Sequence, residues 1–214
     1  FKMEWRPDTL TNIILRPNMS YSTTRTGSFS QSGTFNDDPY NYVDNPNDFL
    51  DLNALAQADL LSDEDPLKDI RVNTSNNRSS SDGNALSAQA TLQVNRKLNS
   101  KGRNITFRGR FEYGDDDSDQ YSSSDTRYFL TGRTQDDHTI RRYITAPSTD
   151  YSYQAQLTYS EPIAKATFLQ FSYRFQYSLS ESDKNTYDLA GLGWEWGDRL
   201  PDDYLEHRDD DQSK

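Results

Sequence analysis

Apolar and polar residues alternate along several stretches of this chain, and this period of two constrains the fold more than any other feature. Between Ile105 and Tyr113 every second residue is Ile, Phe, Gly or Tyr, and those between are Thr, Arg or Glu. A β-strand uses such a pattern because successive side chains point to opposite faces, whereas a helix needs a period near 3.6. The alternation predicts six strands, over residues 1–6, 11–22, 85–95, 104–114, 151–160 and 168–180.

The connections between these strands are of two kinds. Residues 6–9, 96–103 and 161–165 are short and carry Pro, Asn or Gly, as hairpin turns do, whereas 23–84, 115–150 and 181–214 are long and polar. Transmembrane β-barrels sort short turns to one end and long loops to the other. We therefore predict an all-β fold, an antiparallel up-and-down meander of about six strands that forms part of a transmembrane β-barrel wall. A single partial barrel domain is expected over 1–214.

The first long loop contains one helical pattern. Its apolar positions are spaced as on one face of a helix, and they predict a short helix near 48–61 that folds the loop onto the barrel rim. These positions are Phe49, Leu52, Leu55, Ala56 and Leu60.

The two faces of the expected sheet differ in chemistry. Tyr151, Tyr153 and Tyr159 flank Ala155 and Leu157, a small aromatic girdle of the kind found at membrane interfaces. The residues expected to face lipid are Phe107, Phe111, Tyr151, Tyr159, Phe171 and Phe175, and those expected to face the lumen are Arg108, Arg110 and Arg174. The predicted partners of the aromatic face are the lipid bilayer and lipopolysaccharide.

Composition excludes several classes of protein. The 214 residues carry a net charge of −11 with a pI near 4.6, which argues against a nucleic-acid partner. Hydrophobic residues are 32% of the chain, and no apolar run approaches the roughly 20 residues of a spanning helix. Aromatic residues are 13%, too many for a disordered acidic chain. The negative charge is concentrated in residues 36–69 and 181–214, interpreted as solvated external loops.

Catalytic and metal-binding motifs are missing from the sequence. Cysteine is absent, the two histidines are His138 and His207, and no nucleophile elbow, zinc-protease motif or phosphate loop occurs. We therefore predict no enzyme activity and no catalytic, cofactor or metal site. One weak alternative stays open: Asp115, Asp117 and Asp119 match positions 1, 3 and 5 of a calcium loop. Gln120 and Thr126 then replace the required Gly and Glu, so an exposed acidic loop tip is the simpler interpretation.

Four segments resemble a known family. Residues 1–13 (FKMEWRPDTLTNI), 99–109 (NSKGRNITFRG), 157–163 (LTYSEPI) and 168–177 (FLQFSYRFQY) look like the barrel of TonB-dependent-receptor-like outer-membrane proteins of the Bacteroidota. The similarity extends over nearly the whole chain and is strongest at the strands and turns. It implies a segment of a longer protein with a carboxypeptidase-regulatory-like domain, a plug and a barrel of roughly twenty or more strands.

The resemblance also implies a location and a role. The expected location is the outer membrane of a Gram-negative bacterium, where the parent protein would import a nutrient. A surface lipoprotein or the TonB system would act as partner through the full-length parent. The sequence contains no TonB box, plug or substrate motif. A transport function is therefore implied only by the resemblance, and the substrate is not identified.

An alternative from another class is a soluble all-β binding or adhesion module. Its aromatic face would then form a sandwich core or a platform for a carbohydrate or protein ligand. Six strands cannot close around a lumen. The isolated piece in water is therefore expected to self-associate or to cover its aromatic face with its own loops.

Overall fold

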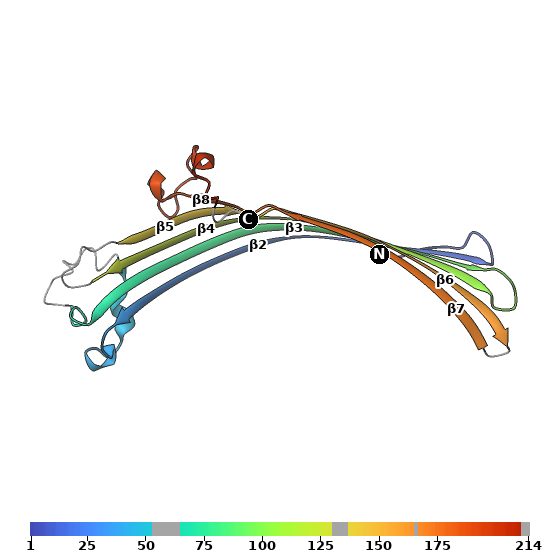
Figure 1. The fold of residues 1–214 in the computed structure, drawn as a ribbon, viewed down its shortest axis with the longest axis horizontal. Coiled ribbons are helices and arrows are strands. Elements are labelled where there is room, and N and C mark those ends of the chain that lie inside the picture. The colour runs from blue at the N-terminus through green and yellow to red at the C-terminus, as the bar shows by residue number, and fades with distance from the viewer. Residues whose placement is uncertain (53–64, 130–136, 165–166, 211–214) are drawn as a thin grey trace. The chain divides into compact units, whose positions relative to one another are not determined.

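The computed structural model describes residues 1–52, 65–129, 137–164 and 167–210, and they form an all-β protein built on antiparallel strands (Figure 1). The strands are β1 (Met3–Trp5), β2 (Thr11–Phe35), β3 (Arg71–Lys97), β4 (Asn104–Tyr128), β5 (His138–Thr145), β6 (Ser148–Ala164), β7 (Thr167–Ser182) and β8 (Asn185–Asp188). Short 3-10 helices are η1 (Pro39–Asn41), η2 (Pro46–Phe49), η3 (Ala190–Leu192) and η4 (Tyr204–His207). The predicted fold class, an antiparallel meander, is confirmed, and within the described residues the sheet is not closed into a barrel.

Contacts along the chain define two compact units, and the single partial barrel domain expected over 1–214 stays a prediction. Unit 1 comprises residues 1–23, 83–117 and 146–183, and unit 2 comprises residues 24–82, 118–145 and 184–214. Strands β2, β3 and β4 each contribute one part to each unit.

Unit 1 is an antiparallel sheet in the order β1-β2-β3-β4-β6-β7. Two of its predicted short turns are observed. In the β1–β2 turn, Asp8 Oδ1 accepts hydrogen bonds from the backbone N–H groups of Leu10 at 2.8 Å and Thr11 at 2.6 Å. In the β3–β4 turn, Gly102 has φ of +102°, a conformation that residues with a Cβ rarely adopt. These local side-chain and glycine signals fix the hairpins.

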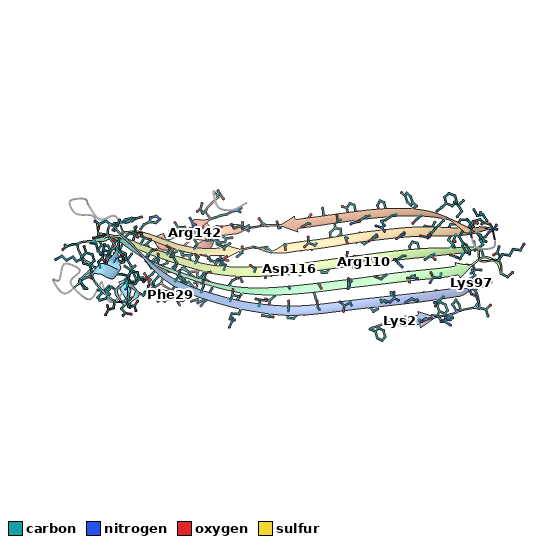
Figure 2. The ribbon with its side chains drawn as sticks, turned by 90° about the horizontal axis from the view of Figure 1, so that it is seen from below. Lys2, Phe29, Lys97, Arg110, Asp116 and Arg142 are labelled. Carbon is teal, nitrogen blue, oxygen red and sulfur yellow. The ribbon has the colours of Figure 1, made fainter. Side chains whose placement is uncertain are left out.

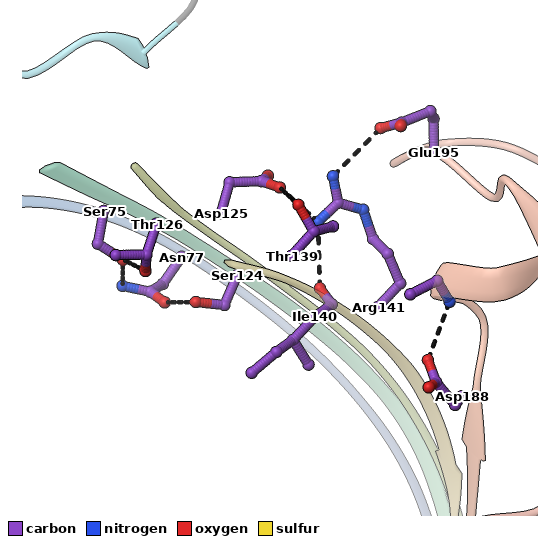
Figure 3. A network of polar contacts seen from close by, with 11 residues as sticks. Ser75, Asn77, Ser124, Asp125, Thr126, Thr139, Ile140, Arg141, Asp188 and Glu195 are labelled. Carbon is purple, nitrogen blue, oxygen red and sulfur yellow. Dashed lines mark hydrogen bonds and ion pairs between the residues drawn. The ribbon is translucent and has the colours of Figure 1, made fainter. Parts of the chain in front are cut away.

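The prediction that 23–84, 115–150 and 181–214 are long loops is wrong for much of these ranges, where the structure has strands. The structure extends β2 to Phe35, starts β3 at Arg71 and continues β4 to Tyr128, and it adds β5 and β8 to the six expected strands. The physical reason is that the added parts of β2, β3 and β4 are mostly polar on both faces, so they lack the alternation of apolar and polar residues. Cross-strand hydrogen bonds between polar side chains take its place, including Ser124 to Asn77 at 2.7 Å and Thr126 to Ser75 at 2.9 Å (Figure 3).

Unit 2 has the strand order β2-β3-β4-β5-β8 and a core that sequence reasoning placed in a loop. The segment after β8 lies over β5 on one face of the sheet (Figure 1). It brings Leu189 and Trp194, 0% and 4% exposed, onto Tyr143 and Tyr187. The acidic composition of residues 181–214 hid this core because charged residues alternate with the aromatic ones.

The helix expected near 48–61 is only partly within the described residues. The chain forms η2 over Pro46–Phe49, capped by the side chain of Asn45, which accepts a hydrogen bond from the Asn47 N–H. Residues 53–61 of the expected helix lie outside the described ranges.

Candidate functional site

The apolar residues of unit 1 are brought into register across three strands. Pairing between β4, β6 and β7 sets Phe107 opposite Leu157 and Leu157 opposite Tyr173. The same ladder sets Phe111, Tyr153 and Tyr177 in a row. We call the odd-numbered side of β4, β6 and β7 the apolar face of unit 1, and its members are Ile105, Phe107, Gly109, Phe111, Tyr113, Tyr151, Tyr153, Ala155, Leu157, Tyr159, Leu169, Phe171, Tyr173, Phe175, Tyr177 and Leu179.

This apolar face is open to the surroundings. Tyr173 is 72% exposed, Phe171 59% and Phe175 54%, although each would be buried in the core of a water-soluble protein. Loop coverage of this face, one of the two expectations for the isolated piece, is therefore not seen within the described residues. Such a contiguous bare apolar surface normally contacts lipid or another protein.

A hollow of about 400 Å³ lies in the apolar face where the small residues meet. Gly109 stands opposite Ala155, which stands opposite Phe175, so the rings of Phe107, Phe111 and Phe175 border a gap. Lipid acyl chains or an apolar side chain are the groups that such a surface can accommodate.

All six residues predicted to face lipid belong to rows of this ladder, and two of them, Tyr159 and Phe171, pair with each other. The tyrosines at the two ends differ in their contacts. The Tyr151 ring lies 6.4 Å from that of Tyr177, and the Tyr159 hydroxyl donates a hydrogen bond to Glu161. All six thus share one face, and lipid contact stays a prediction.

The even-numbered side of the same strands, the polar face of unit 1, carries the arginines predicted to face the lumen. Arg108, Arg110 and Arg174 lie on this side, with Arg110 marked on β4 in Figure 2. Arg108 Nη2 donates to Gln93 Oε1 at 3.3 Å, and Arg174 Nη2 donates to Gln156 Oε1 at 3.5 Å. The polar face is therefore covered by guanidinium, amide and hydroxyl groups that form hydrogen bonds with one another, and such a surface suits contact with water.

Sequence reasoning missed that Arg16 of β2 joins this group. Arg16, Arg108, Arg110 and Arg174 line one hollow of about 260 Å³ with Thr91, Gln154 and Gln156. Arg16 occupies a polar position of the alternating pattern, which was the only signal in the sequence that could have found it.

Unit 2 has a different charge and a buried arginine. It contains twenty-four acidic and twelve basic residues, whereas unit 1 contains ten acidic and eleven basic ones, so the negative net charge of the chain belongs entirely to unit 2. Arg141 on β5 is 6% exposed and forms ion pairs with Asp125 at 2.8 Å and Glu195 at 3.4 Å (Figure 3). The pair with Glu195 attaches the segment after β8 to the sheet.

Ionisation in unit 2 responds to this packing. Burial raises the pKa of Tyr143 far above its ordinary value of 10.0, and the hydrogen bond and charge of Asp119 raise it further. Burial also raises the pKa of Tyr121, whose ring lies 4.9 Å from that of Tyr143.

In the β1–β2 turn of unit 1, the hydrogen bond from the Leu10 N–H lowers the pKa of Asp8, and the donors of Thr11 add to the effect. These shifts follow structural contacts and mark no general acid or base.

The three aspartates of the weak calcium alternative lie in β4 and not in a loop tip. Asp115 Oδ1 accepts a hydrogen bond from Thr149 at 3.2 Å, and Asp119 Oδ1 accepts one from Tyr143 at 2.8 Å. In an extended strand the three residues cannot wrap around an ion as the calcium loop does. Among the described residues no group of three or more His, Cys, Asp or Glu is arranged to hold a metal ion.

No protein-family model matches this chain, and no curated protein matches it either. No helix in the described part of the chain is long and apolar enough to cross a membrane. The function is therefore inferred from the two faces of unit 1.

Proposed function

We propose that unit 1 is part of the wall of an outer-membrane β-barrel, with its apolar face against lipid and its polar face towards the lumen. The observation that carries this proposal is the register of β4, β6 and β7, which aligns rings and aliphatic side chains on one face and Arg, Gln, Ser and Thr on the other. Strands of transmembrane barrels alternate in this way. In the finer form of the proposal, the parent is a receptor related to TonB-dependent receptors that imports a nutrient.

The exposure of the apolar face supports this assignment. Burying apolar area stabilises a protein by about 25 cal/mol per Å², so a soluble protein gains by covering such a face. Phe171, Phe175 and Tyr173 are each more than half exposed instead. Contact with hydrocarbon would remove their rings from water without any further protein layer.

The outer edge of β7 defines what the complete barrel must supply. Within the described residues β7 pairs only with β6, so one side of its backbone has no strand partner. Each backbone N–H or C=O group left without a hydrogen bond in hydrocarbon raises the free energy of the protein by roughly several kcal/mol. The proposal therefore requires a further strand beside β7 in the assembled wall.

The composition of unit 2 is compatible with a position in water. Its excess of acidic side chains keeps a surface solvated, as external parts of barrels require. The same excess would strongly disfavour insertion into hydrocarbon.

Spin labelling in lipid tests the proposal. This chain contributes no native cysteine, so single cysteines placed along β7 in the complete protein, reconstituted in lipid vesicles, give clean label positions. Labels at 171, 173 and 175 should be relaxed by oxygen, which is soluble in lipid, and labels at 172, 174 and 176 by a water-soluble nickel chelate. The reverse pattern, or equal access of the chelate to both sets, would refute the assignment.

A soluble binding module is the second candidate, and the exposure of Tyr173 is the observation that favours it. Exposed tyrosine rings can stack on sugar rings as well as lie at a membrane interface. Size exclusion of the 214-residue chain without detergent separates the two functions. A compact monomer with a cooperative thermal transition supports the module, whereas association through the apolar face supports the barrel wall.

A further inference from the structure

The hollow on the polar face of unit 1 gathers four arginines from three strands. Arg16 comes from β2, Arg108 and Arg110 from β4, and Arg174 from β7, around a volume of about 260 Å³. The remaining lining residues are Thr91, Gln154 and Gln156, which are neutral hydrogen-bonding groups. We call this set the arginine hollow.

Strand register holds these side chains together. Gln156 on β6 stands directly between Arg108 of β4 and Arg174 of β7, and Gln154 stands opposite Arg110. Arg108 and Arg110 are two positions apart on one strand and therefore point to the same side. The convergence is a property of the sheet itself and does not depend on any loop.

The positive charge of the hollow is only partly balanced. Arg110 pairs with Glu112 at 2.5 Å, and Glu112 also accepts a hydrogen bond from Ser152. For Arg16, Arg108 and Arg174 the described residues provide no ion pair. Arg108 and Arg174 contact amide oxygens of glutamines instead. Three guanidinium groups, which stay protonated at any ordinary pH, thus share one small space, and the part of the chain that the structure describes gives them no counter-charge.

The chemistry of the lining selects the ligand. A guanidinium presents two parallel N–H donors that match the two oxygens of a carboxylate or a phosphate. Gln154 and Gln156 can add amide N–H donors. Arg108 and Arg174 are exposed, so the N–H donors of their guanidinium groups are accessible from solvent. A single negative charge would leave two of the three arginines uncompensated, so an oxyanion with two or more charges fits best.

We propose that the arginine hollow binds a polyvalent oxyanion, a phosphate ester or a polycarboxylate. The site belongs to unit 1 alone and stands whichever medium lies against the apolar face. Where the polar face lines a lumen, the hollow would make that lumen select for anionic solutes.

Calorimetric titration of the full chain in a non-ionic detergent, at low ionic strength, tests the proposal. Inorganic pyrophosphate and citrate serve as separate arms that distinguish a phosphate from a carboxylate preference, and chloride serves as the monovalent control. Saturable binding of at least one of the two is expected, and it should weaken as salt screens the charges. Absence of saturable binding of both overturns the proposal.

Matched variants locate the binding. Arg108→Gln and Arg174→Gln should each weaken binding about tenfold, as loss of one charge-assisted contact does, while Arg199→Gln, at an exposed pair in unit 2, should leave it unchanged. Equal affinity of the wild type and the Arg108→Gln/Arg174→Gln double variant would place the anion elsewhere and overturn the proposal.

A measurement on the wild type covers the case of a variant that fails to fold. Phenylglyoxal modifies accessible arginines, and mass spectrometry reads each site. Pyrophosphate or citrate should protect Arg16, Arg108 and Arg174 but not Arg199. Equal modification with and without both ligands argues against the site.

Discussion

The Tyr143 hydroxyl on β5 donates a hydrogen bond to Asp119 Oδ1 on β4, across a distance of 2.8 Å. Tyr143 is 8% exposed, and its ring lies edge-on to that of Tyr204 at 5.5 Å and near that of Tyr187 at 6.0 Å. One bond thus links the aromatic core of unit 2 to its acidic strand surface. Because a tyrosinate in this position would be buried beside a carboxylate, the pKa of Tyr143 is strongly raised.

The raised pKa of Tyr143 makes unit 2 sensitive to alkali. In the unfolded chain the hydroxyl loses its proton near pKa 10.0, whereas in the folded chain it keeps it, so the folded state binds more protons above that pH. Stability should be constant below the unfolded pKa and fall as pH rises beyond it. Urea unfolding at a series of pH values between about 8 and 11, compared with Tyr143→Phe, measures the effect. A parallel loss in the wild type and the variant would contradict it.

Arg141 should contribute more to stability than its neighbour Arg142. Arg141 is buried and pairs with Asp125 and Glu195 (Figure 3). Arg142 is the next residue of β5, so its side chain points to the opposite face of the strand. Arg141→Ala leaves two carboxylates without their partner and should destabilise unit 2 by about 2 kcal/mol. Arg142→Ala should change stability by less than about 0.5 kcal/mol. Chemical denaturation measures both.

A second readout separates loss of the Arg141 ion pairs from general destabilisation. The segment after β8 should become accessible to limited proteolysis in Arg141→Ala under conditions where the folded fraction is still high. Equal cleavage rates in Arg141→Ala and Arg142→Ala would mean that the Glu195 pair does not hold this segment.

The sequence predicted those strands that separate apolar from polar residues. β4, β6 and β7 alternate Phe, Tyr and Leu with Arg, Gln and Ser, so both their existence and the side of each residue followed directly. The stretch from Ser75 to Ser81 has no such contrast, because polar side chains occupy both sides, so its sequence favours a loop although it forms part of β3. Its pairing depends on a distant strand that only the folded chain brings near.

For the candidate sites, the sequence predicted which face each residue occupies, but it did not predict which residues come together. Alternation placed Arg108, Arg110 and Arg174 on one face, but their convergence with Arg16 needs the register of several strands at once. The aromatic core of unit 2 joins Tyr121, Tyr143 and Trp194 over long sequence separations, and the tail that carries Trp194 is acidic on average. Average charge therefore concealed residues that are individually buried.

Gly102 should resist substitution. Its φ of +102° lies in a region costly for residues with a Cβ, and an added Cβ would approach the Phe168 ring to 3.3 Å. Gly102→Ala should therefore destabilise the β3–β4 hairpin by about 1–2 kcal/mol. Gly191→Ala is the control, because its φ is ordinary and an added Cβ meets no atom within 4 Å. Hydrogen exchange of the β3 and β4 amides measures the effect, and equal protection in both variants would refute it.

A charge on the apolar face should discriminate between membrane and soluble functions. Phe175 and Gln176 are neighbours on β7 that point to opposite faces of unit 1. In the barrel-wall proposal Phe175→Arg places a charge in hydrocarbon and should reduce the stability of the complete protein in lipid vesicles by about 2–4 kcal/mol, as lipid-facing arginines do in barrels. Gln176→Arg adds the same charge to the water-facing side and should cost less than about 1 kcal/mol. Urea-dependent folding into vesicles, followed by gel mobility, gives both values. If Phe175→Arg folds as well as Gln176→Arg and is more soluble without detergent, the apolar face does not contact lipid.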